Sequence, residues 1–187
     1  ALGVDALGFN LAQGPRRIPI EHAATLTRLL PPFITAVGLF VNASEADILT
    51  SARSARLHAI QLHGDEPPEL AANLRRHLVV IKAFRIANAA DLARVRGYPA
   101  DAYLLDAAVS GHSGGTGTTW DWSLLATTQA PLGAPLLLAG GLRPDTVAAA
   151  IARTTPWAVD VASGIESAPG LKDHARMAAF VAAVRGT

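Results

Sequence analysis

Asp106 ends an apolar run, Leu104-Leu105-Asp106, and a segment rich in glycine and serine (107–119) follows directly. A carboxylate at the end of a buried strand can act as a general acid or base, or can simply cap the turn. A loop that closes over such a residue excludes water from a reacting site. We therefore predict that Asp106 is a catalytic residue beneath a closing loop.

The glycine-rich segment does not fit a nucleotide-binding loop. A P-loop requires Gly-x-x-x-x-Gly-Lys followed by Ser or Thr, but the stretch 104–122 contains no lysine. A dinucleotide fingerprint starting at Gly115 would need a glycine where Trp120 stands. Trp120-Asp121-Trp122 is instead predicted to be structural, with Asp121 capping a following helix.

Two further glycine-containing loops follow the last two apolar runs, at Gly140-Gly141 and Ser163-Gly164. Parallel βα barrels often bind phosphate at these two loops through backbone N–H groups, and glycine lets the backbone approach the ligand. Ordinary turn glycines are the alternative for either loop alone. The two together favour a phosphate site.

Other polar residues close or follow apolar runs. Arg16 and Arg17 offer a bidentate partner for a carboxylate, although one of them is expected to be merely solvated. His63 is more readily a hydrogen-bonding residue than an acid or base, because no partner is visible in the sequence. Lys82 fits either a Schiff base or a structural pair. No His-x-His or His-Glu-x-x-His spacing occurs, so no metal site is predicted.

Strands must position these residues, and seven short apolar runs are predicted to be strands. They are continuously apolar, which is typical of parallel strands covered on both faces. Helical periodicity predicts several helices. One opens with a capping box at Ser44 and Asp47, one starts with Asp65-Glu66-Pro67 in its first turn, and one begins at Pro144-Asp145. The last runs over about 173–184, where Met177, Phe180, Val181 and Val184 are expected to be buried. The expected strands are Asp5–Phe9, Ile34–Val41, Ala59–Leu62, Val79–Ala83, Ala102–Asp106, Leu136–Ala139 and Ala158–Val161.

Repeating strand–helix units predict an α/β fold with a parallel sheet. An open doubly wound sheet would need Gly-x-Gly-x-x-Gly after the first strand, which the sequence lacks. A (β/α)8 TIM barrel places its functional residues at the carboxyl ends of several strands, as this sequence does. We predict such a barrel, with seven of the eight strands visible, as a single domain over 1–187.

Composition narrows the possible partners. Half of the residues are hydrophobic, 17% are charged and the net charge is +1, which favours a globular chain without nucleic-acid or membrane partners. The absence of cysteine excludes disulfides and thiolate metal sites within these residues and suggests a cytoplasmic protein.

Motifs along the whole chain resemble the phosphoribosylanthranilate isomerase family. They are Val-Gly-Leu-Phe-Val-Asn (37–42), Gln-Leu-His-Gly (61–64), Ile-Lys-Ala (81–83), Leu-Leu-Asp (104–106), the segment 114–122, Gly-Gly-Leu (140–142), Asp-Val-Ala-Ser-Gly-Ile-Glu (160–166) and Pro-Gly-x-Lys-Asp (169–173). The resemblance implies a phosphate-binding barrel of tryptophan biosynthesis, acting on a small phosphorylated substrate without cofactor, as a monomer or homodimer.

The resemblance also implies roles for individual residues. Asp106 corresponds to the general acid that protonates the ribose ring oxygen, and Arg16 to the arginine that faces the anthranilate. The phosphate loops correspond to Gly140, Gly141, Ser163 and Gly164. The residues expected to line the same mouth are Gln61, His63 and Asp160.

The sequence departs from the family pattern at the catalytic base. The family begins with a strand reading Lys-Ile-Cys-Gly, whose cysteine removes the C2′ proton, and this chain has no cysteine. About 20 residues, one strand and most of a helix, are therefore expected upstream. Either the functional protein has them, or the chain is a truncated variant. As it stands we expect at most residual activity, because a lost base typically costs about 10²–10⁴-fold.

Rival interpretations remain open. Indole-glycerol-phosphate synthase would need a lysine and glutamate set that cannot be placed here. The bifunctional histidine/tryptophan isomerases would be expected to use aspartates on both halves, which the Gln61–His63 segment does not provide. A phosphate-ligand-binding remnant without turnover is the non-enzymatic alternative.

Overall fold

The computed structural model describes residues 2–107 and 132–187. Within them the chain forms two compact units. The N-terminal unit comprises residues 4–83 and 99–101, and the C-terminal unit comprises residues 2–3, 84–98 and the described part of 102–187.

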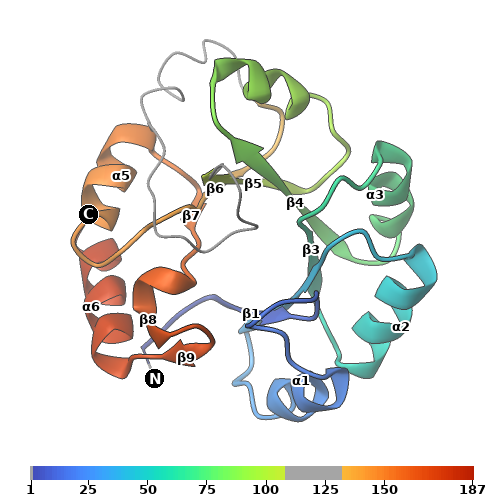
Figure 1. The fold of residues 1–187 in the computed structure, drawn as a ribbon, viewed down its shortest axis with the longest axis horizontal. Helices are drawn as coiled ribbons and strands as arrows, with labels where there is room; N and C mark the ends of the chain where they lie inside the picture. Colours follow the sequence, from blue (N-terminus) through green and yellow to red (C-terminus); the bar gives the residue numbers. More distant parts are fainter. Residues whose placement is uncertain (1, 108–131) are drawn as a thin grey trace. The chain divides into compact units, whose positions relative to one another are not determined.

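The N-terminal unit alternates parallel strands with helices. Its strands lie side by side in chain order, and α1, α2 and α3 follow β1, β2 and β3 along the chain (Figure 1). The register aligns Phe40 with Leu62, and Leu62 with Lys82. The elements are β1 (Ala6–Asn10), α1 (Ile20–Thr27), β2 (Thr35–Phe40), α2 (Glu45–Ser54), β3 (Ala59–Leu62), α3 (Pro68–Leu74) and β4 (Val79–Ile86), whose last three residues belong to the C-terminal unit.

Local sequence explains much of this unit. Every residue of β3 is buried, as expected for an inner parallel strand. Helix α2 begins after Ser44, whose hydroxyl accepts a hydrogen bond from the Asp47 N–H group at 3.1 Å. Its Ile48 and Ala52 are buried. The sequence therefore specifies both the start of the helix and the face that packs.

The C-terminal unit contains three further parallel strands, β5 (Ala102–Ala107), β6 (Leu136–Leu138) and β7 (Ala158–Val159). Helices α5 and α6 lie beside each other (Figure 1). The remaining elements are the 3₁₀ helices η1 (Ala89–Arg94) and η2 (Ser163–Ile165), α5 (Val147–Thr154), the antiparallel pair β8 (Glu166–Ala168) and β9 (Leu171–Lys172), and α6 (His174–Arg185).

All seven expected strands are present, but several predictions of detail are wrong. Strand β4 extends to Ile86 and β7 ends at Val159, and helix α1 was not predicted. Helix α5 begins at Val147, because the residues before it form a turn in which Thr146 N donates to the Arg143 carbonyl. On α6 only Phe180 is buried, whereas Met177, Val181 and Val184 are partly exposed.

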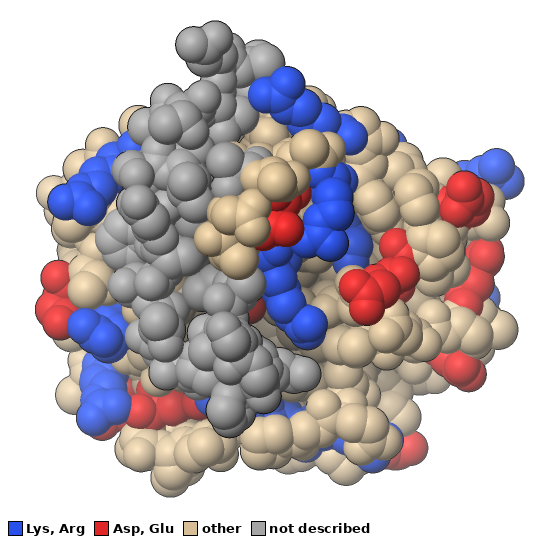
Figure 2. All heavy atoms as spheres, turned by 45° about the horizontal axis from the view of Figure 1, so that its top comes forward, with Lys and Arg blue, Asp and Glu red and all other residues tan. Residues whose placement is uncertain are grey.

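Charge is dispersed on the face drawn in Figure 2, where basic and acidic side chains are interspersed among uncharged ones. In the described residues, no helix is long and apolar enough to span a bilayer.

Candidate active site

Asp106 is the penultimate residue of β5 and is partly exposed. The strand positions it rigidly, because Leu104 and Leu105 immediately before it are buried. The glycine-rich loop and Trp120-Asp121-Trp122 lie outside the described residues, so the closing loop stays a prediction. Asp106 therefore occupies the strand end that the sequence predicted.

The two predicted phosphate loops meet in the C-terminal unit. Gly140 and Gly141 follow β6 and have φ angles of 85° and 69°, a region that favours glycine. Ser163 and Gly164 begin η2, after β7. A Cβ atom on Gly164 would lie only 1.8 Å from the Leu142 carbonyl oxygen. The structure thus brings together the four residues for which a phosphate role was predicted.

An ion pair lies directly after the second of these loops. Lys172 Nζ is 3.0 Å from Glu166 Oε1 and donates to the Ala162 carbonyl at 3.0 Å. Glu166 is buried, and its backbone carbonyl also accepts a hydrogen bond from Arg176. Asp160, which follows β7, is exposed, and its N–H group donates to the Leu138 carbonyl. Hydrogen bonds and an ion pair therefore hold the backbone in place both before Ser163 and after Gly164.

Arg16 and Arg17 lie between β1 and α1 and differ in exposure. Arg16 is partly buried, whereas Arg17 is exposed and donates its N–H to the Gly14 carbonyl within a turn. The prediction that one of the two is simply solvated stays a prediction, with Arg17 the more exposed of the two.

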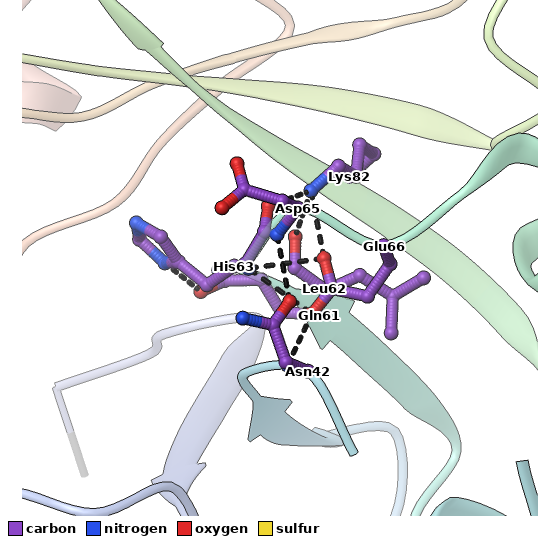
Figure 3. A network of polar contacts seen from close by, with 8 residues as sticks. Asn42, Gln61, Leu62, His63, Asp65, Glu66 and Lys82 are labelled. Carbon is purple, nitrogen blue, oxygen red and sulfur yellow. Dashed lines mark hydrogen bonds and ion pairs between the residues drawn. The ribbon is translucent and has the colours of Figure 1, made fainter. Parts of the chain in front are cut away.

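His63 and Gln61 are partners in the N-terminal unit. Gln61 is buried in β3, and its Oε1 atom lies 3.0 Å from His63 Nδ1 (Figure 3). Because an amide oxygen only accepts, the His63 tautomer that fits this contact carries its proton on Nδ1. The sequence showed no partner for His63, although Gln61 is only two residues away, in the strand that ends just before His63.

Lys82 forms a buried ion pair with Glu66, with Nζ 2.8 Å from Oε2. The two side chains are 4% and 1% exposed. Burial raises the pKa of Glu66, but hydrogen bonds from Lys82 and from the Asn42 N–H group lower it, with a net decrease. Of the two interpretations of Lys82, the geometry supports the structural pair. The expectation that Glu66 belongs to the first turn of a helix is wrong, because α3 begins at Pro68.

Sequence reasoning missed Glu66 and Glu166. The available signal was the scarcity of lysine: the chain has only Lys82 and Lys172 beside many arginines. Both lysines pair with a buried glutamate next to a predicted site loop.

Known structures with similar folds define the class of this protein. A crystal structure of phosphoribosyl anthranilate isomerase from Thermotoga maritima superposes with a TM-score of 0.93 at 39% identity, covering 100% of this chain and 90% of that one. Another isomerase structure, in complex with reduced 1-(o-carboxyphenylamino)-1-deoxyribulose 5-phosphate, gives a TM-score of 0.89 at 37% identity with the same coverage. The chain therefore has the (β/α)8 TIM-barrel type of fold, with seven parallel strands described.

Sequence comparison names the family. The family model for N-(5'phosphoribosyl)anthranilate (PRA) isomerase matches residues 2–183. The N-(5'-phosphoribosyl)anthranilate isomerase of Moorella thermoacetica is 49% identical over 184 residues, which are 98% of this chain and 81% of that protein. The chain belongs to the phosphoribosylanthranilate isomerase family.

Proposed function

We propose that this protein catalyses the Amadori rearrangement of N-(5'-phosphoribosyl)anthranilate to 1-(2-carboxyphenylamino)-1-deoxyribulose 5-phosphate, a step of tryptophan biosynthesis. The family match over residues 2–183 is the observation that carries this proposal. The reaction moves protons within one substrate, so we propose neither a cofactor nor a metal.

Asp106 is proposed as the general acid. It donates a proton to the ribose ring oxygen, the C1′–O bond breaks, and the anthranilate nitrogen forms a Schiff base with C1′. Loss of the C2′ proton then gives an enolamine, which tautomerises to the aminoketone product. The position of Asp106 at the end of the rigid strand β5 supports this role.

Substrate binding is assigned to the remaining candidates. The backbone at Gly140, Gly141, Ser163 and Gly164 is proposed to bind the 5′-phosphate, supported by the two positive φ angles and the contact of Gly164 with Leu142. Arg16 is proposed to pair with the anthranilate carboxylate. Gln61, His63 and Asp160 are proposed to contact the substrate at the same mouth.

Turnover is tested by following anthranilate fluorescence after substrate is added, and binding by calorimetric titration with the reduced product. Asp106→Asn should abolish turnover and leave the affinity for the reduced product nearly unchanged. A fully active variant would refute the acid assignment.

We keep binding of the phosphorylated ligand without turnover as a second candidate. The cysteine base that the family resemblance implies is not among these 187 residues. Reduced product that binds while substrate fluorescence stays constant would support this candidate. Turnover at the rate of ordinary isomerases would contradict it.

The oligomeric state is proposed to be monomer or homodimer. A related isomerase from Thermotoga maritima is described as dimeric. Sedimentation equilibrium of this chain distinguishes the two states.

A further inference from the structure

Lys82 binds the backbone on both sides of His63. Its Nζ atom donates to the carbonyl oxygens of Leu62, at 3.3 Å, and Gly64, at 2.6 Å. These residues immediately precede and follow His63. A third hydrogen bond from the same ammonium reaches Glu66 (Figure 3). The three N–H groups of a lysine ammonium can serve all three acceptors.

Glu66 belongs to the same loop, between β3 and α3, and binds its backbone. Its two carboxylate oxygens both lie 3.0 Å from the Gly64 nitrogen, and Oε1 also accepts a hydrogen bond from Asn42 N at 2.9 Å. Asn42 in turn accepts from Asp65 N through its side-chain oxygen at 2.8 Å. The loops that follow β2 and β3 are therefore tied together around one buried carboxylate.

The side chains of Asn42 and Glu66 lie close to Gly64. A Cβ atom there would lie 2.3 Å from Asn42 Oδ1 and 2.8 Å from Glu66 Oε1. The backbone N–H of His63 is also bound, by the Phe40 carbonyl at 2.9 Å. Hydrogen bonds from Lys82 and Glu66 to the residues beside His63 thus hold the backbone at this position, together with the Phe40 carbonyl.

The imidazole of His63 points away from Lys82 and Glu66, toward Gln61 (Figure 3). The ion pair therefore acts on His63 through the backbone. We propose that Lys82 and Glu66 are positioning residues, which hold His63 and its Nδ1 contact with Gln61 in the orientation that faces the substrate. This proposal rests on the proposed function and extends it to two residues that do not touch the substrate.

The choice of lysine fits this role. A compact ammonium can bind three oxygens that converge from different directions, whereas the planar guanidinium of arginine suits flat, bidentate partners. Buried ion pairs are on average weak contributors to stability, because removing two charges from water costs about as much as their attraction returns. Stability alone is thus a poor explanation for placing this pair beside His63.

The central experiment compares Lys82→Met with Arg75→Met in the full chain. Arg75 pairs with Asp101 in the same unit at 2.7 Å but is 41% exposed, so it is a matched cation-to-methionine control. Two-dimensional ¹H–¹⁵N spectra of the histidine rings report the His63 tautomer, and calorimetry gives the dissociation constants for the reduced product and for inorganic phosphate.

We expect Lys82→Met to shift the His63 tautomer signals and to weaken binding of the reduced product about tenfold, the effect of one lost hydrogen bond. Inorganic phosphate should bind as before, and Arg75→Met should change neither measurement. If Lys82→Met only lowers the melting temperature and leaves the His63 signals and both affinities unchanged, the positioning role is wrong.

Two further measurements keep the test decisive. Glu66→Gln retains the shape of the side chain and is expected to shift the same His63 signals, so it replaces Lys82→Met if that variant does not fold. Unaltered His63 signals in folded Glu66→Gln would equally overturn the proposal. A wild-type chain that fails to bind the reduced product contradicts the proposed function, while the His63 spectra still decide the positioning role.

Discussion

Gly164 lies directly against the backbone of Leu142, so closely that a Cβ atom would stand 1.8 Å from the Leu142 carbonyl oxygen and 2.9 Å from its carbonyl carbon. Leu142 follows Gly140 and Gly141 without a gap. The two proposed phosphate loops therefore touch at a point where backbone meets backbone. Neither side can yield by rotating a side chain.

Gly164→Ala should consequently disturb both loops. We expect the variant to lose about 1–3 kcal/mol of unfolding free energy, the usual cost of overpacking, and to bind inorganic phosphate several times more weakly. Urea unfolding and calorimetry measure the two effects. Gly186→Ala is the control, because the nearest atom to its new Cβ lies at 3.5 Å. Unchanged phosphate affinity in Gly164→Ala would separate this contact from ligand binding.

Lys172→Met should weaken phosphate binding without altering the loop sequence itself. Its ammonium joins Glu166 to the Ala162 carbonyl, directly before Ser163. Loss of this link should let the loop move and lower phosphate affinity several-fold. Arg94→Met provides the comparison, since it removes a 63% exposed cation paired with Asp91 in the same unit. Equal affinities in the two variants would contradict the prediction.

Stability should depend on pH through Glu66. Burial raises the pKa of this carboxyl, but hydrogen bonds from Lys82 and Asn42 together lower it by more, so the folded pKa lies below the usual 4.5. The unfolded chain therefore takes up the proton first on acidification. The stabilisation is complete above pH 4.5 and is lost as the pH falls toward the folded pKa. Urea unfolding between about pH 6 and about pH 3.5 should show a steeper decrease for the wild type than for Glu66→Gln.

Residues 1–187 are proposed to unfold as one domain. Strand β4 contributes Val79–Ala83 to the N-terminal unit and Phe84–Ile86 to the C-terminal unit, so neither unit has the whole strand. We expect thermal transitions followed by far-ultraviolet circular dichroism and by tryptophan fluorescence to coincide. Two separated transitions would show that the units are independent domains.

Sequence patterns predicted the strands well because burial on both faces leaves a continuous apolar signature, clearest in the fully buried β3. They also located the cap Ser44, whose side chain accepts a hydrogen bond from the N–H group three positions ahead. Positions at strand ends, including Asp106 and His63, followed from the same reasoning. These features are local, and local sequence carries them.

Contacts between residues that are distant in the sequence could not be predicted from the sequence. Glu66 looks like a helix-starting acid beside Pro67, yet its partner Lys82 lies sixteen positions away and only the fold brings the two together. Helix α1 lacks a side-chain cap and buries only Ala23, so its sequence has neither of the usual signals. Even where a contact was local, as between Gln61 and His63, the direction of the side chains had to come from the structure.

The two lysines have a practical consequence for chemical labelling. Lys82 and Lys172 are the only lysine side chains in the sequence, and they are 4% and 40% exposed. An amine-reactive ester can reach Lys172 in the folded chain, whereas Lys82 becomes accessible only when its surroundings open. The ratio of the two labelling rates, measured by mass spectrometry, therefore reports how often the loop after β3 opens. The labelling rate of the buried Lys82 amine therefore measures local unfolding of this chain, in which nearly all other positive charges are arginines.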